Sequence, residues 1–199
     1  ALTTNDAAIT FKSPVMLGEN VTINSGTADI TFNGGVGGAK DLTIGTMTGA
    51  AVFNGNVTLV DLITSSTSAT IKLYGAANTF TSAVDFKNTG EVVLGNGDDD
   101  TFNFNGGVTF SGNAPVYLHG KIVMSGDFGF GTTATTLKGN TEITTGGAAT
   151  FGGTLDGDGN GSHNLTILAV TVTFDGEVGG AEPLGALNIS GSTTIKANI

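Results

Sequence analysis

The chain contains no cysteine and no arginine, and only three prolines interrupt its 199 residues. Without cysteine, disulfide bonds, thiolate zinc sites and thiol chemistry are excluded. The net charge of −10 comes from 17 acidic residues and 7 lysines. A nucleic-acid partner requires a basic surface, usually with arginine for phosphate contacts, so this partner class is excluded. An acidic surface suits solubility and divalent cations instead.

Helical periodicity and long apolar runs are also missing. No segment sustains an i, i+3, i+4 apolar pattern, and the 33 glycines would be costly inside helices. No apolar run approaches the length of a membrane span, and no basic-then-apolar leader opens the chain at Ala1, which we interpret as a mature or trimmed start. β-Branched residues and phenylalanine alternate with polar residues throughout, which predicts an all-β protein.

Phenylalanine recurs at an interval of roughly 21 to 27 residues, which marks an internal repeat. The repeated positions are Phe11, Phe32, Phe53, Phe80, Phe104, Phe130, Phe151 and Phe174. All but Phe80 close an apolar-x-Phe triplet, and an apolar residue, usually valine, stands four positions after the phenylalanine. A period of this length indicates a supersecondary unit that buries its apolar face only by stacking on its neighbours.

Short period-2 strands separated by Gly/Asn turns at this interval predict a right-handed parallel β-helix (β-solenoid) of about eight to nine coils. We expect residues 1–199 to form a single solenoid domain with repeats of about 21–27 residues. A β-sandwich gives no reason for phenylalanine to return to one phase eight times. In a β-helix equivalent residues stack about 4.8 Å apart, so the eight phenylalanines are expected to form one internal ladder.

Two segments carry a family resemblance: ITFNGGVGGAKDLTI, which begins at Ile30, and VTFDGEVGGAEPLGALNI, which begins at Val172. They resemble the β-strand repeats of filamentous-haemagglutinin-type bacterial surface adhesins. The resemblance covers most of the chain, from about Ile9 to Ile195. It implies a right-handed β-helix exported to the bacterial cell surface and acting in adhesion, matrix or filament formation. The secretion domain of that family is not recognisable, so we expect a fragment of a larger protein or a short repeat protein that assembles.

Two acidic loops are candidate calcium sites. The first is Asp156-Gly157-Asp158-Gly159-Asn160-Gly161, in which Asp156, Asp158 and Asn160 match the first half of an EF-hand-like loop. The bidentate glutamate is missing from it, because Ile167 occupies that position. A polar, glycine-rich turn between coils is the alternative interpretation.

The second acidic loop contains three adjacent carboxylates, Asp98, Asp99 and Asp100, after a Gly-Asn-Gly turn. It is similar to the calcium turn of RTX repeats, but only one copy is present and its spacing is off by one position. Adjacent acids repel one another unless a cation or solvent intervenes. Calcium is therefore a candidate ligand, although no cofactor is required by the sequence.

The remaining polar residues point to structural roles. His119 and His163 are interpreted as solvated turn histidines, because no Cys- or Ser-based motif surrounds them. Four formal glycosylation sequons are interpreted as strand-edge chemistry, and they begin at Asn20, Asn56, Asn164 and Asn188. Enzymes that share the β-helix architecture use clustered carboxylates with arginine, lysine or histidine, and this chain lacks that set, so we predict a protein that is not an enzyme.

The expected function is that of a non-enzymatic extracellular or cell-surface structural protein of a bacterium, fibre-forming or adhesive. Both solenoid ends would carry unpaired strand edges, so head-to-tail self-association into filaments is expected. Glycans or a neighbouring cell surface are candidate further partners. The alternative is a carbohydrate- or ice-binding module that uses a threonine-rich outer face, on which Thr31 and Thr79 would lie together.

Overall fold

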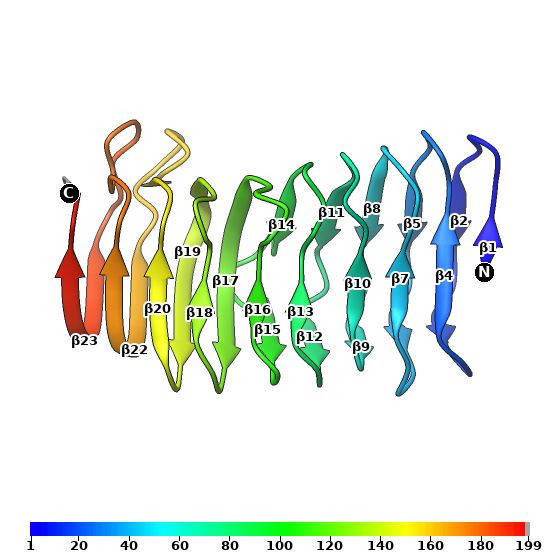
Figure 1. Ribbon diagram of the computed structural model, residues 1–199, viewed down its shortest axis with the longest axis horizontal. Coiled ribbons are helices and arrows are strands. Elements are labelled where there is room, and N and C mark those ends of the chain that lie inside the picture. Colours follow the sequence, from blue (N-terminus) through cyan, green and yellow to red (C-terminus); the bar gives the residue numbers. More distant parts are fainter. Residues whose placement is uncertain (198–199) are drawn as a thin grey trace.

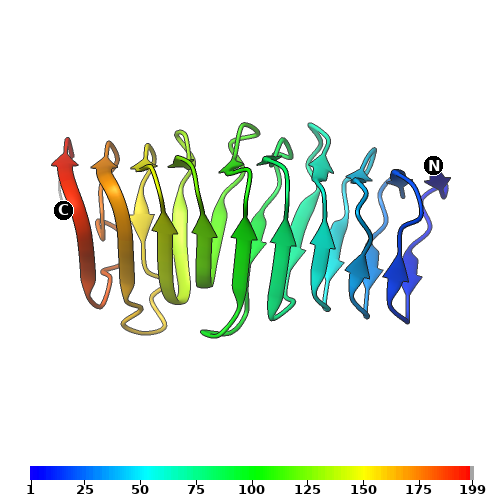
Figure 2. The ribbon, with the colours of Figure 1, turned by 90° about the horizontal axis from the view of Figure 1, so that it is seen from below.

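The computed structural model describes residues 1–197 and shows a parallel β-solenoid, an elongated stack of turns that runs from β1 at one end to β23 at the other (Figure 1). Every regular element within these residues is a strand. Residues 1–197 hold no helix long and apolar enough to cross a membrane. Turned by 90°, the stack remains straight (Figure 2). The predicted all-β solenoid is confirmed.

Each turn contributes strands to three faces, which we name A, B and C in the order the chain meets them. Face A consists of β1 (Leu2–Thr3), β4 (Val21–Asn24), β7 (Leu42–Ile44), β10 (Leu62–Thr64), β13 (Val84–Asp85), β16 (Val108–Thr109), β18 (Phe128–Gly129) and β20 (Ala148–Phe151). Face B consists of β2 (Ile9–Phe11), β5 (Ile30–Phe32), β8 (Ala50–Phe53), β11 (Thr70–Leu73), β14 (Val92–Leu94) and β21 (Leu155–Asp156). Face C consists of β3 (Val15–Met16), β6 (Val36–Gly37), β9 (Val57–Leu59), β12 (Ala77–Phe80) and β15 (Thr101–Phe104).

Four longer strands bend round a corner and serve two faces. β17 (Val116–Met124) and β19 (Thr135–Thr145) run from face B to face C, and β22 (Leu165–Phe174) and β23 (Leu187–Ile195) run from face C to face A. The corner of β17 lies at Gly120 and that of β23 at Gly191, both with positive φ, a conformation that favours glycine. All pairings are parallel and join each turn to the next.

Nine stacked positions on face B define the number of residues in each turn. They are Ile9, Ile30, Ala51, Ile71, Val92, Val116, Thr135, Leu155 and Val178. The step between neighbouring positions is shortest from Val116 to Thr135 and longest from Val92 to Val116. On average, one turn is shorter than the interval between the repeated phenylalanines.

The expectation of a single phenylalanine ladder is wrong. On face B, Phe11, Phe32 and Phe53 stack with ring centroids 4.7 Å apart. On face C, Phe80 stacks on Phe104 at 5.1 Å. The third ladder lies on face A at 5.1–5.2 Å and consists of Phe86, Phe110, Phe130, Phe151 and Phe174. Phe86 and Phe110 lie outside the sequence series because each follows a series member, Phe80 or Phe104, by only six residues.

The longest phenylalanine intervals span one turn plus one side of the solenoid. Phe53 pairs with Leu73 of the following turn, and Phe80 comes after Leu73 on the next face. Phe104 likewise pairs with Met124, and Phe130 comes after Met124 on the next face. All three faces point into one core, so a phenylalanine is buried equally well on any of them. For this reason the interval alone does not reveal a change of face.

The threonines of the alternative binding face do not share one side of the solenoid, for the same reason. Thr10 pairs with Thr31 on face B, Thr79 pairs with Asn103 on face C, and Thr150 pairs with Thr173 on face A. Thr31 and Thr79 therefore lie on different faces. No single outer face within residues 1–197 carries the predicted threonine series.

Candidate functional site

The corners of the solenoid are braced by Asn and Asp side chains, each of which accepts a hydrogen bond from a backbone N–H one turn away. Distances are 2.7–3.1 Å for the acceptors Asp6, Asn24, Asp29, Asn56, Asp127 and Asn164. Corner N–H groups lie outside the regular strand ladder and still need an acceptor, and a short Asx side chain provides one. These contacts hold successive turns in register.

Three of the sequon asparagines take part in this bracing. Asn20 exchanges two hydrogen bonds with Asp41, at 2.8 and 3.0 Å. Asn56 accepts from Ala77 N at 3.1 Å, and Asn164 accepts from Ala186 N at 2.8 Å. The interpretation of these residues as strand-edge chemistry therefore agrees with their hydrogen bonds.

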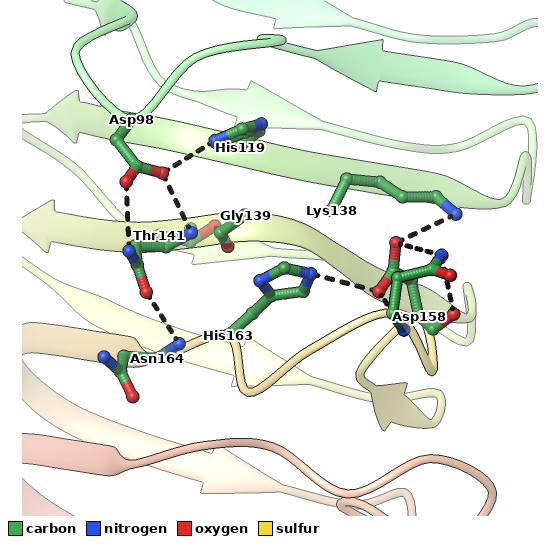
Figure 3. A network of polar contacts seen from close by, with 10 residues as sticks. Asp98, His119, Lys138, Gly139, Thr141, Asp158, His163 and Asn164 are labelled. Atoms are coloured by element: carbon green, nitrogen blue, oxygen red, sulfur yellow. Dashed lines mark hydrogen bonds and ion pairs between the residues drawn. The ribbon is translucent and has the colours of Figure 1, made fainter.

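The most extensive polar network is centred on Asp98, in the loop between β14 and β15 (Figure 3). Its Oδ1 lies 2.7 Å from His119 Nε2, one turn on, and 3.2 Å from the backbone N of Asn140, two turns on. The Asn140 amide also donates to Asp98 Oδ2 at 3.0 Å. Hydrogen bonds from Asn140 and then His119 hold the pKa of Asp98 below its usual value.

This reach across two turns depends on Gly139. The ring of His119 lies directly over Gly139, where a Cβ would overlap its atoms. The network continues along the solenoid, because Asn140 Oδ1 accepts from Asn164 N at 3.1 Å (Figure 3). Asp98, His119 and Asn140 thus link three successive turns and lead to a fourth.

A second network surrounds Asp158, whose side chain is only 8% exposed. Its Oδ1 lies 2.9 Å from the backbone N of Asn160 and 3.0 Å from His163 Nε2, and its Oδ2 lies 3.1 Å from Asn160 Nδ2 and 3.6 Å from Lys138 Nζ (Figure 3). The hydrogen bonds from Asn160, followed by those from His163, hold the pKa of Asp158 far below its usual range.

The structure separates the other predicted calcium ligands. Asp156 Oδ1 accepts from Ala181 N at 3.0 Å, and Asp100 Oδ2 accepts from Asn96 N at 2.8 Å and Gly97 N at 3.0 Å. Asp99 is exposed to solvent. Within residues 1–197 no group of three or more His, Cys, Asp or Glu side chains is arranged to hold a metal ion. Calcium binding would require displacement of protein donors from Asp156, Asp158 or Asp100, and it stays a prediction.

The histidines are part of these networks, so their interpretation as solvated turn residues is wrong. His119 and His163 are only partly exposed, and each places Nε2 against an aspartate. An ionised carboxylate accepts only, so each Nε2 donates a hydrogen. A signal was present in the sequence: the step from Asp98 to His119 equals the step from His119 to Asn140, and each is one turn.

The two networks link turns of one solenoid, and in both of them the aspartate oxygens accept from several donors. No family model matches this chain, and neither a curated protein nor a solved structure matches it. The functional conclusion therefore rests on the geometry of the chain and on the sequence of its repeats.

Proposed function

We propose that the protein is a non-enzymatic structural element of a bacterial cell surface or extracellular matrix, and that copies extend it by stacking end to end. The observation that carries this proposal is the location of the exposed large hydrophobic side chains. Among residues 1–197 they are Leu2, Met16, Leu168, Val170 and Ile195. All five belong to the first turn or to the last two turns, and Leu2 and Ile195 continue the core columns of Ile23 and Phe174 to the open ends of the stack.

The end strands also have free edges. At one end β1, β2 and β3 are paired only with the following turn, and at the other β23 is paired only with β22 among the described residues. Free edges of parallel strands offer N–H and C=O groups to a further strand. The Phe11 ring stacks on Phe32 and is only partly buried, so the first turn presents an aromatic surface to whatever covers it.

Stacking one copy on another would cover the end residues Leu2 and Ile195 and the free strand edges. Such head-to-tail contacts use different surfaces on the two partners, so they propagate without closing. The similarity of the repeats to those of surface adhesins supports an extracellular location and an adhesive fibre. Inter-turn bracing by Asx side chains supports a stiff rod.

Sedimentation and electron microscopy of the purified chain test the proposal. We expect rods whose lengths are multiples of one chain and whose proportion rises with concentration. Ile195→Lys, which places a charge on the free edge of β23, should shift the protein to single units while leaving its circular dichroism unchanged. Thr58→Lys, at an exposed position on β9 away from both ends, is the control and should assemble normally. A dispersed monomer at high concentration would overturn the proposal.

A further inference from the structure

A groove of about 560 Å³ crosses the outer surface of face B at its middle turns. Its floor is Val93 and Gly95 of the β14 turn, and its sides are formed by Tyr74 from the preceding turn and by Tyr117 and His119 from the following turn. The strand register explains this arrangement, because Lys72, Val93 and Tyr117 lie side by side and alternate residues share a face. Small side chains in the middle turn therefore lie between large ones.

The hollow is fixed by the backbone. Gly95 has a φ of +89°, and a Cβ at this position would overlap the carbonyl oxygen of His119. The loop that follows is held by Asp100, which accepts hydrogen bonds from Asn96 N and Gly97 N. Tyr74 and His119 belong to strands two steps apart, so their backbones are about 9–10 Å from each other. The groove is thus preformed.

The groove gathers side chains that are rare elsewhere in the chain. The chain has only two tyrosines and two histidines, and both tyrosines and one histidine line this groove. The phenylalanines, by contrast, stack inside the solenoid. An outward aromatic side chain provides an apolar surface with a polar tip, which is a common feature of binding sites.

The polar groups at its edge include both donors and acceptors. Glu91 lies beside Tyr117, and burial together with this carboxylate raises the pKa of the Tyr117 hydroxyl, which therefore stays protonated. Lys138 Nζ lies 5.3 Å from the centroid of the Tyr117 ring and 3.6 Å from Asp158, so its charge is already balanced. Asn96 adds an amide, which both donates and accepts.

We propose that this groove binds a neutral oligosaccharide. A pyranose ring has apolar C–H surfaces that pack on tyrosine and hydroxyl groups that pair with carboxylate and amide groups, which is the combination present here. An anionic ligand is disfavoured by Glu91 and by the pairing of Lys138 with Asp158. This site differs from a threonine face, since none of its lining residues is threonine.

A neighbouring hollow of about 440 Å³ indicates that more than one sugar unit is bound. It is lined by Asp98, His119, Lys138, Gly139, Asn140 and His163. It shares His119 and Lys138 with the first groove and lies one turn further along the stack. The second unit would lie beside the His119 ring, on the side of His163, so the sugar chain runs parallel to the solenoid axis.

Tyrosine fluorescence provides a direct test, because the chain has no tryptophan and its only two tyrosines line the groove. The probes are cellotetraose, xylotetraose, mannotetraose and β-1,4-galactotetraose, with tetragalacturonate as the anionic comparison. We expect saturable changes in emission with at least one neutral tetraose and none with tetragalacturonate. Tetraoses should bind more tightly than the corresponding monosaccharides.

Variants locate the site. Tyr117→Ala should weaken binding, measured by calorimetry, about tenfold or more, and Tyr117→Phe, which keeps the ring, should weaken it less. Thr31→Ala, on face B but four turns away, is the control and should bind normally. Circular dichroism shows that each variant is folded. The proposal is overturned if no neutral tetraose binds, if only tetragalacturonate binds, or if folded Tyr117→Ala and Tyr117→Phe both bind like the parent protein.

Discussion

Asp98 and Asn140 are hydrogen-bonded to each other although two turns of the solenoid separate them. His119 belongs to the intervening turn, and Gly139, next to Asn140, leaves room for its ring. One carboxylate thereby holds three turns together. Strand pairing joins only adjacent turns of a solenoid. A side-chain bridge of this kind adds a direct link between two turns that are not adjacent.

Truncation of a central phenylalanine should destabilise the protein strongly. Phe104 is fully buried and stacks on Phe80 at 5.1 Å. Phe104→Ala should lower the free energy of unfolding, measured by urea titration, by about 3–5 kcal/mol. Phe11→Ala is the matched control: Phe11 is only partly buried at the end of its ladder, so its loss should be clearly smaller. Equal losses would contradict a core packed by these ladders.

Two glycines near His119 should respond differently to alanine. At Gly95 the added Cβ would overlap a backbone oxygen, and its φ of +89° is unfavourable for other residues, so nothing nearby relieves the strain. At Gly139 the three atoms nearest the added Cβ all belong to the His119 ring, which moves aside at the expense of its bond to Asp98. Thermal melting should show a far larger loss for Gly95→Ala than for Gly139→Ala. The opposite order would be inconsistent with this arrangement.

Replacement of Asp61 should stabilise the protein. Its Oδ1 is buried without a hydrogen-bond partner among the described residues. Burial and then the neighbouring Asp41 raise its pKa, so its ionised form opposes folding at neutral pH. Asp61→Asn should add about 1 kcal/mol at pH 7 by thermal melting. The gain should shrink as acid protonates Asp61 in the parent protein; a gain that persists unchanged at pH 3 would count against this cause.

Acid should weaken the inter-turn networks. Asp98 and Asp158 have folded-state pKa values below their unfolded values, so their stabilisation is complete above about pH 5. It is lost as the pH falls through the lowered folded-state values. Urea midpoints measured between pH 7 and pH 2 should therefore decrease with acidity. Asp158→Asn should melt lower at pH 7 and show a flatter acid dependence, and a slope like that of the parent protein would exclude Asp158 as a contributor.

Calcium removal provides a test of the two acidic loops. Both oxygens of Asp158 already accept from protein donors, and Asp100 accepts from two backbone N–H groups. The predicted calcium site requires a cation to displace these donors, and it should raise the melting temperature in calcium and lower it in chelator by mass action. Coincident melting temperatures in calcium and in chelator would contradict it.

The repeat, the alternation of apolar and polar residues and the high glycine content were enough to predict a parallel β-solenoid and its number of turns. Local sequence carries this information because each strand has to bury every second side chain and each corner has to bend. The candidate polar residues Asp98 and Asp158 were also recognised from their loops. Of their partners, only Asn160 was among the candidates, although the same one-turn spacing links Asp98 to His119 and His119 to Asn140.

Only the tertiary structure decided which face each strand occupies. Phe53 and Phe80 are both followed four positions on by a valine, yet they lie on faces B and C, because the interval between them comprises one full turn, from Phe53 to Leu73, and then one side of the solenoid. If a strand moved to the next face, its apolar residues would still be buried, so hydrophobicity alone does not determine which face a strand occupies. On the outer surface, the face that each strand occupies decides which side chains are neighbours. Tyr74, Val93 and Tyr117 lie beside one another on face B, whereas Thr31 and Thr79 lie on different faces.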